Sequence, residues 1–130
     1  MLFGGNSLFR EIGYDNGSVF PQENYIIKKT QTLDTIVKNN NYEYPDLIKI
    51  DAQGGELNIL KGATECLKHA SYLIVELQNV NYNDGAPMAN VVIDWLTSVG
   101  WVLILAKFSD NGPDADYCFC RRETFNNLLK

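Results

Sequence analysis

Two carboxylates, Asp51 and Glu76, are the residues best placed to do chemistry, because each ends a short apolar run. If the runs 47–50 and 72–75 are buried parallel strands, both side chains lie at one rim of a sheet, where open α/β sheets bind ligands. A carboxylate there, followed by a turn that lets the backbone approach a ligand closely, is well placed for chemistry. The alternatives are an Asp51 that caps the next helix and a Glu76 that is paired within the sheet.

The elements that would position these carboxylates follow from the spacing of apolar residues. The pair Gly54-Gly55 predicts a turn, and a helix with Leu57, Leu60 and Leu67 on one stripe should begin near Glu56. A strand, a helix and a second strand form a βαβ unit, which implies a parallel sheet.

Further helices and strands are expected on both sides of this unit. Thr32 is typical of an N-cap for a helix carrying Leu33, Ile36 and Val37, and residues 25–30 could form a short strand. The amphipathic stripe of a later helix, ended by Gly100, comprises Met88, Val91, Val92, Trp95, Leu96 and Val99.

The last part of the chain predicts a β-hairpin. The runs 101–108 and 116–120 are separated by a turn-rich loop that is too short for a helix, so the two strands must be antiparallel. The expected fold is therefore α/β, with a mostly parallel sheet that ends in an antiparallel hairpin.

Composition excludes several classes of protein. The chain has 130 residues, a net charge of −5 and a pI near 4.7, which argue for one domain or part of one and against a nucleic-acid surface. No apolar segment approaches the roughly 20 residues needed to cross a bilayer. Three cysteines make no disulfide framework, so we expect a reduced, cytoplasmic protein. One histidine and scattered carboxylates have no metal-ligand spacing, so no metal site is predicted.

The stretch 46–63, Asp-Leu-Ile-Lys-Ile-Asp-Ala-Gln-Gly-Gly-Glu-Leu-Asn-Ile-Leu-Lys-Gly-Ala, resembles the signature of FkbM-type methyltransferases. The resemblance extends to residues 4–9, 32–34, 81–87 and 110–114, and so covers nearly the whole chain. Ala52 and Gly55 stand where Val and Ala are commoner, and both are small enough for the turn to survive.

This resemblance implies a Rossmann-like class I methyltransferase fold and S-adenosylmethionine as cofactor. It implies O-methylation of a hydroxyl on a sugar or another small or glycan-type acceptor. The candidate catalytic residues are Asp51, Glu76 and Glu56, although Glu56 could simply cap its helix. The candidate cofactor-binding residues are Asp51, Gln53 and Gly54, and the loop residues expected to border the acceptor are Asn81, Tyr82, Asp110 and Asp114.

The family's Gly-rich cofactor loop and its ribose-binding carboxylate have no counterpart in this sequence. Residues 1–130 are therefore expected to be the C-terminal part of the catalytic domain, with weak or no cofactor binding of their own. The run 47–50 would then be an open apolar sheet edge, so we expect poor solubility, self-association, or capping by residues 1–30.

Two other readings remain open. The chain could be an inactive remnant of the methyltransferase fold that serves as a binding or interaction module. It could also be a small α/β hydrolase that uses Asp51 and Glu76 as paired carboxylates, although the downstream loops resemble the methyltransferase pattern closely.

Overall fold

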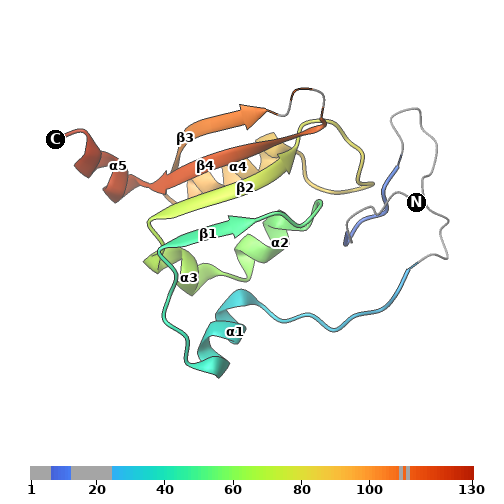
Figure 1. Ribbon diagram of the computed structural model, residues 1–130, viewed down its shortest axis with the longest axis horizontal. Helices are drawn as coiled ribbons and strands as arrows, with labels where there is room; N and C mark the ends of the chain where they lie inside the picture. The colour runs from blue at the N-terminus through green and yellow to red at the C-terminus, as the bar shows by residue number, and fades with distance from the viewer. Residues whose placement is uncertain (1–6, 13–24, 109, 111) are drawn as a thin grey trace.

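The computed structural model describes residues 7–12, 25–108, 110 and 112–130, which fold into an α/β structure around a four-stranded sheet (Figure 1). The strands are β1 (Leu47–Ile50), β2 (Tyr72–Gln78), β3 (Trp101–Phe108) and β4 (Asp114–Arg121). The helices are α1 (Leu33–Asn40), α2 (Glu56–Lys61), α3 (Thr64–His69), α4 (Ala89–Ser98) and α5 (Arg122–Leu128). The pair Gly4-Gly5 lies outside the described residues.

The order of the strands in the sheet is β1-β2-β4-β3. β1 and β2 are parallel as predicted, and the antiparallel hairpin of β3 and β4 is confirmed. The hairpin lies at one end of the sheet, as expected, but a mostly parallel pairing is wrong, because β4 lies between β2 and β3 and pairs antiparallel with both. Three strands still run in one direction, but one pairing is parallel and two are antiparallel. The crossover through α4 carries β3 past the position next to β2, and the returning β4 fills it.

The core lies between one face of the sheet and helices α2, α3 and α4. Alternation along each strand places every second side chain on this face, as in β2, where Leu73, Val75 and Leu77 are buried. The buried side chains that pack with them include Ile48, Ile50, Leu60, Cys66, Leu67, Val92, Leu96, Tyr117 and Phe119. The opposite face carries exposed apolar side chains, among them Leu47 and Tyr72.

Helix α1 begins as the sequence predicts. The Thr32 side chain accepts a hydrogen bond from the backbone N–H of Thr35, and Asn41 ends the helix in the left-handed region at φ 53°. Val37 is buried in the core, whereas Ile36 is 37% exposed.

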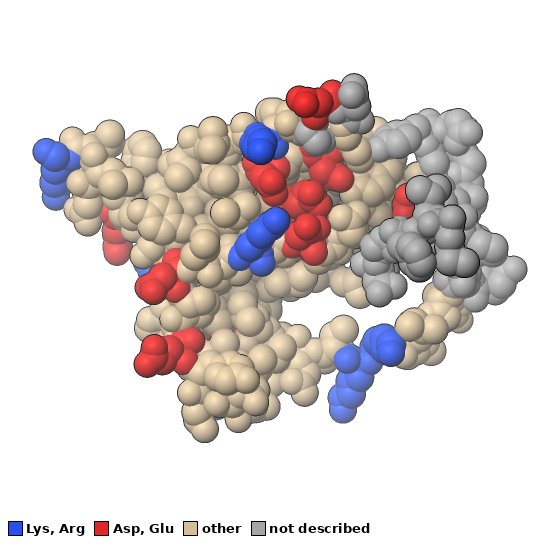
Figure 2. Space-filling view, in the orientation of Figure 1, with Lys and Arg blue, Asp and Glu red and all other residues tan. Residues whose placement is uncertain are grey.

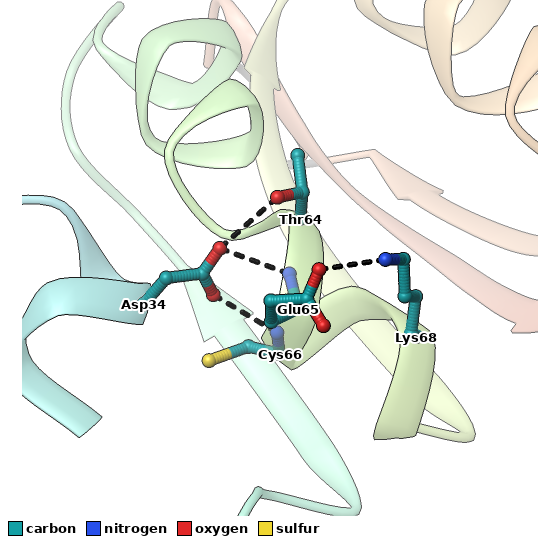
Figure 3. A network of polar contacts seen from close by, with 5 residues as sticks. All are labelled: Asp34, Thr64, Glu65, Cys66 and Lys68. Atoms are coloured by element: carbon teal, nitrogen blue, oxygen red, sulfur yellow. Dashed lines mark hydrogen bonds and ion pairs between the residues drawn. The ribbon is translucent and has the colours of Figure 1, made fainter. Parts of the chain in front are cut away.

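The single helix expected after the glycine turn is instead divided into α2 and α3 at Gly62. No side chain of α3 or of its N-cap residue Ala63 caps this helix. Asp34 of α1 supplies the cap: its carboxylate accepts from the backbone N–H groups of Glu65 and Cys66, both at 2.9 Å, and from the Thr64 hydroxyl at 3.1 Å (Figure 3). Burial raises the pKa of Asp34, but these hydrogen bonds outweigh it and hold the pKa below its ordinary value.

The N-terminal part of the chain lies against the loop that follows β2. Glu11 and Asn83 form an isolated antiparallel bridge, and the backbone N–H of Ile12 donates to the carbonyl of Tyr82 at 2.7 Å. The predicted strand at residues 25–30 is wrong, because this stretch is irregular and exposed and pairs with none of the described strands. Helix α5 was not anticipated from the sequence.

β1 is at the end of the sheet and pairs only with β2 among the described strands. The described part of residues 1–30 does not pair with it, so capping of this edge is not seen there. Cys66, Cys118 and Cys120 are free thiols. Within the described ranges, no helix is long and apolar enough to cross a membrane.

Candidate active site

The carboxylates Asp51 and Glu76 lie at the same rim of the sheet, as expected. Ile50 pairs with Val75 in the parallel register, so Asp51, directly after β1, lies beside Glu76, which is two residues before the end of β2. Asp51 is exposed at this rim, whereas Glu76 is only partly exposed on the open face of the sheet.

A tight turn joins Asp51 to α2. Gln53 and Gly54 have positive φ angles of 50° and 99°, and Glu56 closes the turn from within. The Glu56 side chain is 4% exposed, and its Oε1 accepts from the backbone N–H groups of Ala52 at 3.0 Å and Gly54 at 3.1 Å. Glu56 thus fixes the backbone that carries Asp51, and it does not cap α2, whose N-terminus has no side-chain cap hydrogen bond.

The side chain of Gln53 links the two carboxylates. Its Nε2 donates to Asp51 Oδ1 at 3.3 Å and to Glu76 Oε2 at 3.2 Å. The contact with Glu76 joins residues that are 23 positions apart in the chain. The amide therefore bridges β1 and β2 at the rim.

Tyr82 and Asp114 extend this network from the loop after β2 and from the start of β4. The Tyr82 hydroxyl, on a side chain that is 8% exposed, lies 3.0 Å from Gln53 Oε1 and 3.0 Å from Asp114 Oδ2. Burial raises the pKa of Tyr82, and the neighbouring Asp114 carboxyl raises it further, so the phenol keeps its proton. Burial likewise raises the pKa of Asp114, against the hydrogen bond with Tyr82.

The position of β4 next to β2 adds two more charged residues. Asp116 is directly opposite Glu76 in the antiparallel register, and Lys107 of β3 is opposite Asp116. Figure 2 shows acidic side chains gathered over the carboxyl ends of β1 and β2, with basic side chains beside them. Burial first, and then Asp51, Asp114 and Asp116, raise the pKa of Glu76 to about 7. Glu76 is therefore the rim carboxyl that exchanges its proton near neutral pH.

A cavity of about 350 Å³ opens at this rim. Glu76, Asp110 and Asp114 line it, together with Lys107, Phe108, Gly112, Pro113, Ala115 and Asp116. The structure thus brings Tyr82, Asp110 and Asp114, three of the four predicted loop residues, to the rim. Asn81 is exposed one residue before Tyr82 and does not line this cavity.

Asp116 and Lys107 were missed from the sequence alone. The signal that could have found Asp116 is the alternation Asp114-Ala-Asp116, which places both carboxylates on one face of a strand. It could not be used without knowing that this strand pairs with β2.

Gly54 is required by packing within the turn. A Cβ atom there would lie 2.7 Å from Ala86 Cβ and 3.1 Å from Phe9 Cδ2, so the space beside this glycine is filled by protein. Among the described residues, no group of three or more His, Cys, Asp and Glu side chains is placed to hold a metal ion.

These residues fit one end of a methyl donor such as S-adenosylmethionine. The acidic rim is complementary to its positively charged sulfonium group, whereas the amino-acid group of the donor carries both an ammonium and a carboxylate. The described residues include no glycine-rich turn between a strand and a helix beyond the one at Gly54, whose free side is already packed. The fit is therefore to the charged end and not to the adenosine.

The comparisons with known proteins agree with this chemistry. Residues 4–103 match the model of the methyltransferase FkbM domain. Among curated proteins, a hexuronic acid methyltransferase, AglP of Haloferax volcanii, is 37% identical over 49 residues. That match covers 38% of this chain and 20% of the relative. No solved structure matches this chain. Because the domain match spans most of the sequence and includes the rim that holds Asp51 and Glu76, the chain belongs to the FkbM methyltransferase family.

Proposed function

We propose that this chain provides the acceptor-activating rim of an S-adenosylmethionine-dependent O-methyltransferase that acts on a hydroxyl of a sugar or another small or glycan-type acceptor. The observation that carries the proposal is the carboxylate pair at the rim, in which burial and neighbouring charges raise the pKa of Glu76 to about 7. The Haloferax relative is named a hexuronic acid methyltransferase, which supports a sugar as the acceptor class.

The residues of this chain would remove the proton of the acceptor hydroxyl. A general base works best when its pKa is close to the working pH, and Glu76 meets that condition. Asp51, the other member of the pair, is exposed where an acceptor can approach. Glu56 supports Asp51 through the backbone of the turn rather than by touching the acceptor.

Tyr82, Asp110 and Asp114 would border the acceptor together with the exposed Asn81. When bound, S-adenosylmethionine supplies a methyl group on a positively charged sulfur. Asp51 and the turn residues Gln53 and Gly54 would lie beside it, and the acidic rim would favour its positive charge.

A methyl-transfer assay on the gene product tests this function. The protein is incubated with S-adenosylmethionine and a panel of neutral and acidic sugars, and methylated products are detected by mass spectrometry. Asp51→Asn and Glu76→Gln should each lower the rate by about 100-fold or more, as expected for loss of a general base. Glu43→Gln, a change at an exposed carboxylate before β1, is the matched control. Unchanged rates in both rim variants would refute the proposed roles.

Residues 1–130 are proposed to be the C-terminal part of the methyltransferase domain. The genomic sequence upstream of the codon for residue 1 tests this: an in-frame segment encoding a strand and a Gly-rich loop is expected. Isothermal titration of this chain with S-adenosylmethionine should show weak or no binding, and tight binding would contradict the proposed division of the domain. The free thiols fit the proposed cytoplasmic location.

A second candidate function is a non-catalytic binding module. The observation that favours it is the open face of the sheet, where Leu47 and Tyr72 are 52% and 40% exposed. A protein that forms a stable complex but yields no methylated product would support this candidate. Family membership favours neither candidate over the other, but it removes the basis for the paired-carboxylate hydrolase.

A further inference from the structure

The amide of Gln53 has all of its hydrogen-bonding atoms engaged at the rim. Nε2 lies within hydrogen-bond distance of Asp51 Oδ1 and Glu76 Oε2, and Oε1 lies 3.0 Å from the Tyr82 hydroxyl. A primary amide has two N–H donors and one carbonyl acceptor, so each finds a partner. The side chain cannot rotate without breaking its contacts to Asp51, Glu76 and Tyr82.

The two carboxylates and Tyr82 together determine which way this amide points. A reversed amide would place Oε1 against the carboxylates Asp51 and Glu76, where acceptor would face acceptor. It would also remove Oε1 from the Tyr82 hydroxyl, whose single proton would then have Asp114 Oδ2 as its acceptor. Tyr82 can hold this orientation because it is nearly buried and its phenol remains protonated.

The pair needs such a bridge because its surroundings are acidic. The groups that face Glu76 are Asp51 after β1, Asp114 and Asp116 of β4, Lys107 of β3 and the phenol of Tyr82. Like charges on neighbouring strands repel, and Lys107 is the one basic side chain among the described residues that line the cavity. The Gln53 amide is the group that donates hydrogen bonds to both Asp51 and Glu76.

We propose that Gln53 is a positioning residue that holds Asp51 and Glu76 together as a pair sharing one proton, and that Tyr82 locks the orientation of its amide. The inference rests on the proposed function for its purpose, since the shared proton would be the one exchanged with the acceptor. The arrangement itself concerns only groups of this chain, so it can be tested without cofactor or acceptor.

The first test is a pH titration of the Glu76 carboxyl carbon by NMR in protein labelled with ¹³C-glutamate. Gln53→Ala removes the donor to the ionised carboxylate, so the titration midpoint of Glu76 should rise by about one pH unit. Asn58→Ala, which removes an exposed amide from α2, is the control and should leave the midpoint unchanged. A purely structural role for Gln53 would lower stability without moving the midpoint, and that outcome would overturn the proposal.

The second test uses the Gln53 amide itself and remains available if Gln53→Ala fails to fold. In the wild-type protein, the ¹⁵N resonance of Gln53 Nε2 should shift with the same pH midpoint as Glu76. Tyr82→Phe should speed exchange of the two Nε2 protons with solvent, because the amide is no longer locked. Tyr117→Phe is the control, since that hydroxyl donates to Asn79 outside this network.

Outcomes of these tests separate the two proposals. A Gln53 amide that shows no response to pH while Glu76 titrates would overturn the positioning role even if methyl transfer occurs. If Gln53 and Glu76 share a pH midpoint and Tyr82→Phe speeds exchange of the Gln53 amide, the positioning role is supported even if no acceptor is methylated. In that case it is the proposed methyl-transfer function that is refuted.

Discussion

Glu76→Gln should make the protein more stable above pH 7 while removing the base proposed for methyl transfer. Glu76 is partly buried next to Asp51, Asp114 and Asp116, so its ionised form is unfavourable in the folded state. Glutamine keeps the shape of the side chain and an oxygen that can accept the hydrogen bond from Gln53 Nε2. The substitution therefore removes the charge with little change in packing.

The magnitude follows from the rise of the Glu76 pKa from 4.5 to about 7. Such a rise corresponds to roughly 3 kcal/mol, and the access of water to this partly exposed carboxyl reduces it to about 1–2 kcal/mol. For a chain of this length, that gain is about 3–8 °C in melting temperature.

The raised Glu76 pKa makes the free energy of unfolding fall as pH rises, whereas a carboxylate whose pKa is lowered by an ion pair makes it rise. Between pH 4.5 and about 7, the folded protein holds the Glu76 proton that the unfolded chain releases, so the free energy of unfolding falls as pH rises. Above pH 7 the stability that the protonated Glu76 contributes is fully lost. The advantage of Glu76→Gln should therefore be absent near pH 4 and largest above pH 7.

Urea unfolding from pH 4 to pH 8, followed by circular dichroism, measures this effect. Glu43→Gln is the control and should show no comparable gain at pH 8, because Glu43 is exposed and lies outside the rim. If Glu76→Gln is no more stable than the wild type at pH 8, or gains equally at every pH, the electrostatic account of the rim is wrong.

Three further outcomes are expected. Asp34→Ala should lower the free energy of unfolding by about 1–2 kcal/mol, because α3 loses its cap. In urea titrations this difference from the wild type should shrink as pH falls through the lowered Asp34 pKa, and a difference that persists at low pH would contradict the capping role. Gly54→Ala should lower the free energy of unfolding by about 2–3 kcal/mol, and Gly100→Ala by about 1 kcal/mol. Both glycines have positive φ, but only at Gly54 would the added Cβ clash with Ala86, so equal melting temperatures of the two variants would refute this. Sedimentation should show dimers through the edge at 47–50, which no other described strand pairs with on its outer side. A monomer at all concentrations, with these amides exchanging freely, would exclude that edge as an interface.

The local elements were predictable because their signals lie close together in the chain. The Thr32 cap, the strands of the βαβ unit and the left-handed Gly100 after α4 each depend on a few neighbouring residues. The division of the helix at Gly62 was not predictable, because α3 is capped by Asp34 from a different helix. The strand expected at 25–30 fails for a related reason, since a strand needs a partner that its own residues cannot supply.

The candidate site likewise has one part that the sequence predicts and another that depends on the tertiary structure. Its placement at the carboxyl ends of two parallel strands follows from the sequence, since the apolar runs before Asp51 and Glu76 and the helix between them impose that geometry. The chemistry of the site depends on contacts between distant segments. β4 enters the sheet beside β2 and brings Asp114 and Asp116 to Glu76, and the loop after β2 brings Tyr82 to the Gln53 amide. Sequence periodicity specifies which face a side chain occupies, but only the order of strands specifies its neighbours, and those neighbours raise the pKa of Glu76.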